Sequence, residues 1–282
     1  FKVGSNGLRF KLDANSRISL SNNGGAANNT IFGYSAGASI HESSEFNTFI
    51  GHQVSDATMT ATAGYNTGVG ALSLGGLTSG LNNTAVGYKA QFTNATGDWN
   101  TAVGVDALNQ NSGADKNTAV GQSAGEYTTG ADNTYVGYSA GKGAAGADAN
   151  NVGVGASALL DITTGTYNTV VGSSAGFELK EGTYNAVLGY EALKNEDGHG
   201  KNTAIGAQAL FTQNAGEDGL NSAVGFQAGA AITSGINNTI VGALALDAND
   251  TGNNITAVGK DALGATNGAK HGATAIGYKA LH

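Results

Sequence analysis

One five-residue motif, Asn-Thr-Ala-Val-Gly, returns along the chain at a nearly fixed interval. It stands unaltered at residues 83–87, 100–104 and 117–121, and looser copies fill the chain from residue 29 onward. The glycine that closes each copy recurs fifteen times, in steps of 16 to 19 residues and most often of 17. A fixed period indicates a solenoid, and this one is too short for helical repeats, which need about 30 residues or more. The sequence therefore predicts an all-β fold, a parallel β-solenoid or β-roll of about fifteen coils of about 17 residues each.

The positions that recur within each copy predict how one coil is built. The residue before the closing glycine is apolar in every copy, and Ala stands three residues after that glycine in thirteen copies. Between copies lie Gly, Asp, Asn, Thr and Ser, which favour turns. Each coil should thus contain a short strand Thr-x-Val, a tight corner at Gly, a second short strand and a loop. A single coil cannot bury enough apolar surface to offset its conformational entropy, so the coils must stabilise one another by stacking.

Side chains alternate along a strand, which divides the motif between two faces. Thr and Val share one face. We predict that this face is the interior, with the Thr side chains hydrogen-bonded up and down the stack. Asn and the residue between Thr and Val share the other face, and no charged residue occupies that middle position in any copy. A strand with a solvated face should carry polar residues there, so the sequence predicts that both faces are covered.

A second chain is the simplest cover for the second face. Small Ala residues would allow close approach, and we predict a parallel homotrimer around the long axis. The predicted trimer interface consists of Ala85, Ala102, Ala119, Ala204, Ala223, Ala257 and Ala275. The alternative is a flattened core in which a single chain uses both faces.

Residues 1–28 differ from the repeats and are predicted to form an N-terminal cap. Apolar and polar residues alternate at 1–3, 8–12 and 17–20, a period of two that is typical of short strands. The repeat domain is predicted over residues 29–282. Because the chain begins at Phe1 without a visible signal peptide, we expect it to be a processed piece of a longer chain.

Composition excludes several classes of partner and site. The net charge is −8 and no basic cluster occurs, so we expect no nucleic-acid partner. No apolar run approaches the ~20 residues of a membrane-spanning helix, so we expect no membrane insertion. The absence of Cys excludes disulfides and thiolate zinc sites. With 46 Gly and no Pro, the chain is not collagen.

Loop carboxylates are the candidate metal ligands. Asp98, Asp115, Asp132 and Asp148 come five to seven residues before successive closing glycines and could stack as a column. Like charges at that spacing repel, so the carboxylates either point into solvent or share a cation such as Ca²⁺. We predict no other cofactor and no enzymatic activity, with polysaccharide hydrolysis by paired carboxylates as the alternative. The five His show no metal-ligand spacing, and we expect them at the surface.

Aromatic residues are the candidate binding residues. Trp99, Tyr167 and Tyr184 directly precede the Asn of the motif, and the two Tyr lie in consecutive coils and should stack. Such rings could hold a glycan by the apolar face of a sugar; the alternative is local packing at a corner. The Asn itself precedes the Thr position in thirteen copies and is predicted to form a hydrogen-bonded ladder, with a ligand-binding row as the alternative.

The pattern Asn-Thr-Ala-Val-Gly-x-x-Ala-Leu, at Asn100–Leu108 and with Ile205 in the Val position at Asn202–Leu210, resembles repeats of bacteriophage tail fibres and related trimeric fibres. It is also similar to the heads of trimeric autotransporter adhesins, which are left-handed parallel β-rolls with a shorter unit. The segment Gly7–Asp13 looks like the short strand modules that precede such repeats in phage fibres. The resemblance covers essentially the whole chain and implies a fibrous, trimeric architecture.

Together these features predict a structural and adhesive segment of a trimeric phage tail fibre that takes part in host attachment. Its expected location is the virion tail fibre, outside the cell, and its expected partners are copies of itself and a glycan or protein of the host surface. One alternative is the head of a bacterial surface adhesin, located on the bacterial cell surface. Two others are a polysaccharide-depolymerising tailspike and an ice-binding solenoid. Ice binding requires Thr in flat outward rows, which the predicted inward Thr argues against.

Overall fold

The computed structural model describes residues 11–12, 18–19, 28–60, 63–248, 251–265 and 271–282. Contacts within the chain divide it into two units, Phe1–Lys116 and Asn117–His282, which are described separately. The described residues of both units form strands and turns but no helix, so no described segment is a helix able to span a bilayer. The predicted all-β class is confirmed.

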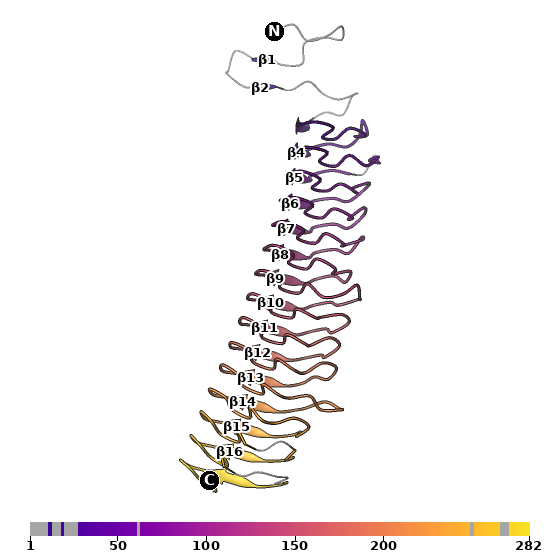
Figure 1. Ribbon diagram of the computed structural model, residues 1–282. Helices are drawn as coiled ribbons and strands as arrows, with labels where there is room; N and C mark the ends of the chain where they lie inside the picture. The colour runs from indigo at the N-terminus through magenta and orange to yellow at the C-terminus, as the bar shows by residue number, and fades with distance from the viewer. Residues whose placement is uncertain (1–10, 13–17, 20–27, 61–62, 249–250, 266–270) are drawn as a thin grey trace. The chain divides into compact units, whose positions relative to one another are not determined.

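The first unit begins with two short strands and continues as stacked coils (Figure 1). Strands β1 (Lys11–Leu12) and β2 (Ile18–Ser19) pair antiparallel, within the predicted N-terminal cap. The cap strand expected at residues 1–3 lies outside the described residues. From here on the strands are parallel and join in chain order: β3 (Thr30–Phe32), β4 (Thr48–Ile50), β5 (Thr67–Val69), β6 (Thr84–Val86) and β7 (Thr101–Val103).

The second unit repeats the same coil. Its strands again pair parallel with the strand of the next coil and in chain order. They are β8 (Thr118–Val120), β9 (Thr134–Val136), β10 (Val152–Val154), β11 (Thr169–Val171), β12 (Ala186–Leu188), β13 (Thr203–Ile205), β14 (Ser222–Val224), β15 (Thr239–Val241), β16 (Thr256–Val258) and β17 (Thr274–Ile276). The register places like positions opposite one another, as in Thr239 beside Thr256. This arrangement confirms the predicted parallel β-solenoid.

The corner after each strand depends on glycine. The closing glycines have φ between 121° and 148°, a region that other residues rarely adopt. At Gly87 an added Cβ would lie 2.4 Å from the carbonyl oxygen of Gly104 in the next coil. Conformation and close stacking therefore both require glycine, as the sequence predicted for this corner.

After the corner the chain forms turns in place of the predicted second strand. Asp106 and Leu108, on either side of Ala107, have left-handed φ values of 56° and 49°. The segment nevertheless bonds neighbouring coils, because the Asp106 N–H donates to the Tyr88 carbonyl at 2.9 Å and the Gln91 N–H donates to the Ala107 carbonyl at 2.9 Å. The prediction of an extended strand is wrong because left-handed residues join the coils here without an extended backbone.

The two faces of the strand are opposite to the prediction. The middle residue is buried in every strand from β4 to β17, whereas the first and third residues are partly or fully exposed. The predicted interface residues Ala85, Ala102, Ala119, Ala204, Ala223, Ala257 and Ala275 are therefore buried inside their own chain. The prediction of an inward Thr and Val face is wrong, because Asn and the middle residue fill the interior. The Ala residues form no surface for a second chain.

The core of each coil lies between the strand and the turn segment that follows it. Large middle residues such as Phe49 and Tyr135 are fully buried, and so are Ala107 and Leu108 on the opposite wall. A loop position that often holds Leu or Ile, such as Leu179, closes the core at the end of the coil. The interior is thus narrow and formed by one chain.

Candidate functional site

In each unit the strands present an outward face that carries no charged side chain. We call it the Thr/Val face: the side chains at the first and third positions of strands β3–β17. No charged residue occurs in these strands. In the second unit the third position keeps large apolar side chains exposed by 37% or more at Val120, Leu188, Ile205, Val224, Val241 and Ile276.

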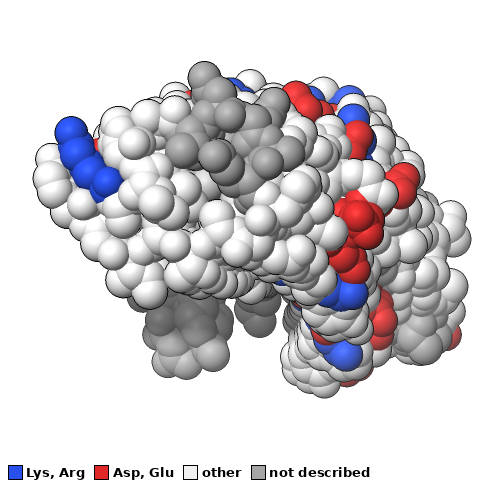
Figure 2. Space-filling model, turned by 90° about the horizontal axis from the view of Figure 1, so that it is seen from below, with Lys and Arg blue, Asp and Glu red and all other residues white. Residues whose placement is uncertain are grey.

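Exposed aromatic side chains follow several of the closing glycines. In the second unit, they stand directly after the closing glycine at Tyr138, Tyr190, Phe226 and Tyr278. These residues lie two positions beyond the third strand residue, next to the Thr/Val face in the chain. The space-filling view in Figure 2 shows Lys, Arg, Asp and Glu gathered mainly in a band, with wide areas free of charge. The exposed third-position side chains of the Thr/Val face therefore form a row suited to contact with another apolar surface.

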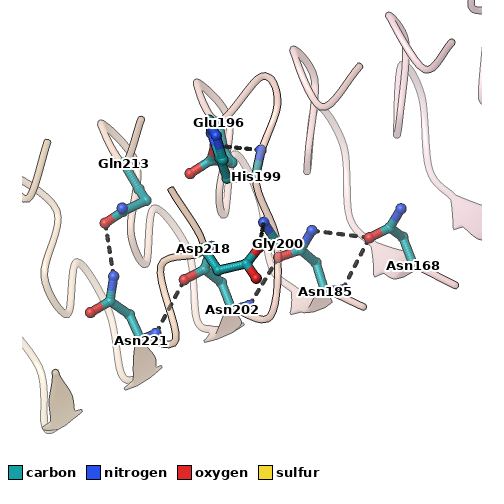
Figure 3. A network of polar contacts seen from close by, with 9 residues as sticks. All are labelled: Asn168, Asn185, Glu196, His199, Gly200, Asn202, Gln213, Asp218 and Asn221. Carbon is teal, nitrogen blue, oxygen red and sulfur yellow. Dashed lines mark hydrogen bonds and ion pairs between the residues drawn. The ribbon is translucent and has the colours of Figure 1, made fainter. Parts of the chain in front are cut away.

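The predicted hydrogen-bonded ladder of Asn side chains is confirmed, but it runs inside the coils and not on the second face where the sequence placed it. The Asn168 Nδ2 donates to Asn151 Oδ1 at 3.1 Å and to the Gly182 carbonyl at 2.8 Å. Asn168 Oδ1 in turn accepts bonds of 3.0 Å from both the backbone N–H and the Nδ2 of Asn185. Figure 3 shows this row continuing to Asn202. Most of these amides bond one another and the backbone, which gives the ladder a structural role, whereas Asn202 Nδ2 has no hydrogen bond of normal geometry among the described residues.

The predicted aromatic residues lie at one corner position of the coil. Trp99, Tyr167 and Tyr184 are half-exposed and all have left-handed backbone near φ 56° to 59°. The rings of Tyr167 and Tyr184 stack with centroids 5.1 Å apart and an interplanar angle of 3°, which confirms the predicted stacking. Stacking covers one face of each ring, so a sugar could meet only the outer faces of this pair.

Phe46 and Tyr65 occupy the same corner position in the first unit. Their rings stack at 5.1 Å with an interplanar angle of 11°. They line a shallow pocket of about 200 Å³ together with Ser43, Glu45 and Leu81. This pocket is a defined hollow at the aromatic corner, and glycan contact there stays a prediction.

The four predicted loop carboxylates lie at three different positions of the coil. Asp98 and Asp115 are equivalent, and their carboxylates accept backbone N–H groups of the preceding coil, from Leu81 at 2.7 Å and from Asp98 itself at 2.8 Å. Asp132 is exposed at the corner position, whereas Asp148 is buried. The structure therefore brings Asp98 and Asp115 into one row. Asp132 and Asp148 lie at two other positions of the coil. A shared Ca²⁺ among the four stays a prediction.

Asp148 is turned into the core. Its Oδ2 accepts a hydrogen bond of 2.6 Å from the hydroxyl of the fully buried Tyr135, and its Oδ1 has no hydrogen bond of normal geometry among the described residues. Burial raises the pKa of Asp148 to about 6, even though the Tyr135 hydrogen bond lowers it. Burial and the nearby Asp148 both raise the pKa of the Tyr135 hydroxyl. Because Asp148 is an ionisable carboxyl buried in the core, the free energy of unfolding should depend on pH.

Another buried acidic group, which the sequence did not single out, lies in the loop between β12 and β13. Glu196, Asp197 and His199 each place a ligand atom so that all three atoms lie within 4.8 Å of one another. Glu196 is fully buried, and Figure 3 shows it beside His199. Burial raises the pKa of Glu196 to about 7, against the lowering effect of the His199 backbone N–H. The signal in the sequence was a charged residue one coil after Leu179, at a loop position that is often apolar.

Comparison with known proteins adds no relative: neither family models, curated proteins nor solved structures gave a match to this chain.

Proposed function

We propose that the chain is a structural and adhesive segment of a trimeric fibre, of the phage tail-fibre type, that takes part in attachment to a host. One observation carries this proposal: the Thr/Val face is uncharged, exposes an apolar row at its third position and is left uncovered by its own chain. The interface proposed here is therefore this face, in place of the buried Ala residues that the sequence indicated.

An uncovered face of this kind favours association. Soluble monomers rarely expose contiguous apolar patches larger than a few hundred Å². Burial of apolar surface contributes about 25 cal/mol per Å². The row in β12–β15 alone contributes the exposed side chains of Leu188, Ile205, Val224 and Val241. Covering these rows with a second and third copy removes them from water.

Copies of the same chain are the fitting partner because the face repeats coil by coil. Like residues stand at the same height in every copy when the copies are parallel, so a rotation axis along the stack matches apolar rows with apolar rows. Closed rotational symmetry is the usual form of soluble homo-oligomers. The resemblance of Asn100–Leu108 to repeats of trimeric fibres favours three copies. The face carries no charge that would select a partner of opposite sign.

A double variant on the Thr/Val face tests this proposal. Leu188→Asp with Ile205→Asp places two carboxylates on side chains exposed by 51% and 38% in the single chain. In a trimer these carboxylates would be buried against each other, so we expect the assembly to dissociate to a lower mass in analytical ultracentrifugation. Thr164→Asp, on an exposed loop residue, is the matched control and should leave the mass unchanged. An unchanged mass in the double variant would contradict the proposed interface.

The adhesive part of the proposal rests on the exposed aromatic corner. Half-exposed rings at Trp99, Tyr167 and Tyr184 stand at equivalent corner positions, where aromatic faces can hold apolar sugar surfaces. The proposed partner is a glycan or protein of the host surface and the proposed location is the extracellular virion fibre, with a bacterial surface adhesin as the alternative. Retention on immobilised host polysaccharide should fall in Tyr167→Ala with Tyr184→Ala. Retention unchanged in that variant would contradict a role of these rings in adhesion.

Ice binding is the second candidate, and the outward Thr positions favour it. In the second unit Thr239, Thr256 and Thr274 lie in one row of the sheet, in register. Neighbouring strands are about 4.8 Å apart, so the Thr hydroxyls form a regular outward array. The sequence predicted inward Thr side chains, which argued against ice binding. In the structure these side chains face outward.

Thermal hysteresis separates the two candidates. Ice binding would be supported if the chain is a monomer, its solution shows thermal hysteresis, and Thr256→Asp reduces that hysteresis. A trimer without hysteresis would support the fibre segment, because its Thr/Val faces would be covered. The mass and the freezing behaviour are measured on the same sample.

A further inference from the structure

The loop between β12 (Ala186–Leu188) and β13 (Thr203–Ile205) carries a buried carboxylate where other coils carry apolar or amide side chains. Glu196 stands seventeen residues after the buried Leu179 and seventeen before the buried Gln213. At the same loop position, Asn94 Oδ1 accepts the Gly97 N–H at 2.8 Å. Glu196 Oε1 makes the corresponding bond with the His199 N–H at 3.1 Å. This backbone bond needs only one neutral oxygen, so it does not account for a carboxylate.

Two further polar atoms of this cluster have no hydrogen-bond partner of normal geometry among the described residues. Glu196 Oε2 is buried without such a bond, although the side chain is fully enclosed. His199 Nδ1 is also buried without a hydrogen bond and lies 3.7 Å from Glu196 Oε1. Burying a carboxylate oxygen and an imidazole nitrogen without partners is costly. An unsatisfied carboxylate oxygen and an unsatisfied imidazole nitrogen on two contacting side chains are the arrangement that a cation would satisfy.

We propose that Glu196, Asp197 and His199 bind a divalent transition-metal ion, with Zn²⁺ as the fitting ion. One imidazole nitrogen and two carboxylates suit Zn²⁺ better than Ca²⁺, which takes oxygen ligands. The three donor atoms already lie within 4.8 Å of one another. Ligand distances to Zn²⁺ are about 2.0–2.2 Å, so a small inward movement of the three side chains completes the site.

The loop is built to allow that movement. Gly198 lies between the ligands, and no atom stands within 4 Å of where its Cβ would be. Asp197 and His199 are half-exposed, which gives the ion a path from solvent. The backbone around them is anchored, because the Asp197 carbonyl accepts the Lys180 and Glu181 N–H groups of the preceding coil at 2.8 and 2.9 Å. A bound ion would hold the side chains of this loop on a fixed backbone.

Titration with Zn²⁺ tests the site directly. The full chain, stripped with a chelator, is titrated with ZnCl₂ by isothermal calorimetry, and Co²⁺ is used in parallel as a spectroscopic probe. We expect one equivalent of Zn²⁺ per chain and a Co²⁺ absorption band of a nitrogen and oxygen site. Ca²⁺ in large excess should not displace the ion. Absence of stoichiometric Zn²⁺ binding would overturn the proposal.

Conservative variants assign the ligands. His199→Gln and Glu196→Gln should each weaken Zn²⁺ binding by at least tenfold, the usual scale for loss of a group at a metal site. Glu181→Gln removes the same charge from an exposed residue of the neighbouring coil and should bind as the unmodified chain does. Circular dichroism in metal-free buffer shows whether each variant keeps its fold. If folded His199→Gln binds Zn²⁺ with unchanged affinity, the proposed ligand set is wrong.

Discussion

At the scale of single residues, the corner glycines carry the tightest constraint in the fold. Gly172 has φ 143°, and an added Cβ would lie 2.2 Å from the carbonyl oxygen of Gly189. Two costs therefore add at this residue: a backbone region open essentially to glycine alone, and a collision with the next coil. The positive φ recurs at every closing glycine and the close approach at most of them, which explains why the motif ends in Gly.

Gly172→Ala should destabilise the fold by about 3 kcal/mol or more, the scale of strained backbone plus overpacking. Urea denaturation at one fixed protein concentration measures this loss. Gly216→Ala is the matched control, because no atom stands within 4 Å of the position that its Cβ would take. That control should change the free energy of unfolding by no more than about 0.5 kcal/mol. Equal effects of the two substitutions would contradict the proposed role of the corner.

Asp148 makes a residue-scale contribution to pH dependence. Its pKa is about 6 in the folded chain and 3.8 as the ordinary value. A carboxyl whose pKa is raised on folding binds more protons in the folded state than in the unfolded state. Its stabilising contribution is therefore complete below pH 3.8 and is lost as the pH rises through 6. The loss amounts to about 3 kcal/mol, since one pKa unit corresponds to about 1.4 kcal/mol.

Asp148→Asn should flatten this pH dependence. The amide oxygen can still accept the Tyr135 hydroxyl, but nothing ionises at residue 148. Between about pH 4 and pH 7 the free energy of unfolding of the unmodified chain should fall relative to that of Asp148→Asn. Urea denaturation of both proteins at several pH values in this range measures the difference. Parallel pH profiles would show that Asp148 is not buried as an acid.

The residue-scale features differ in how far the sequence could predict them. The corner at glycine was predictable because a tight turn at a fixed position favours Gly. The burial of Asp148 and Glu196 was not, because it depends on where each loop lies against its neighbouring coils. Asp148 comes seven residues before Gly155, and Asp132 comes five before Gly137. The spacings are similar, yet Asp148 is buried and Asp132 is exposed.

At the scale of the coil, the Asn ladder joins strand to loop and coil to coil. Most members accept the backbone N–H before the next strand through Oδ1 and donate to a loop carbonyl through Nδ2, as Asn151 and Asn168 do. These bonds satisfy backbone groups that would otherwise be buried without partners. The ladder thus takes the role that helix caps and side-chain turns take in other folds.

Removing one ladder member should cost several bonds at once. Asn168→Ala leaves the Gly182 carbonyl and the Asn185 N–H without their buried partner. We expect a loss of about 3 kcal/mol in the free energy of unfolding, since each buried unsatisfied group costs about 1–3 kcal/mol. Asn214→Ala, on an exposed residue, should cost less than about 0.5 kcal/mol. Similar losses in thermal or urea unfolding would contradict the ladder.

The coil shows why the faces were assigned the wrong way. Period-two alternation correctly separated Thr and Val from Asn and the middle residue. Val is more apolar than Asn or Ala, so transfer free energy alone favoured Val inside. The choice reverses because the Asn amides bond one another and the backbone, and Ala fits a narrow interior. That cooperation between coils is not visible within one motif.

At the scale of the whole molecule, the main feature is the exposed Thr/Val face, which the chain does not cover with residues of its own. The parallel solenoid was predictable from the fixed period. The proposed oligomer rests on the outward third-position rows, because the Ala residues are buried inside their own chain. Each coil repeats the same exposed pair, so an interface formed in one coil is extended by the next. The proposed fibre is thereby stabilised along its whole repeat domain.

The mass of the chain in solution tests this central claim most directly. Sedimentation equilibrium over a range of concentrations should give three times the 27.9 kDa of a single chain, because the Thr/Val faces are covered by one another in the trimer. A stable mass of 27.9 kDa at all concentrations would contradict the account, since it would show that the apolar face remains open to water.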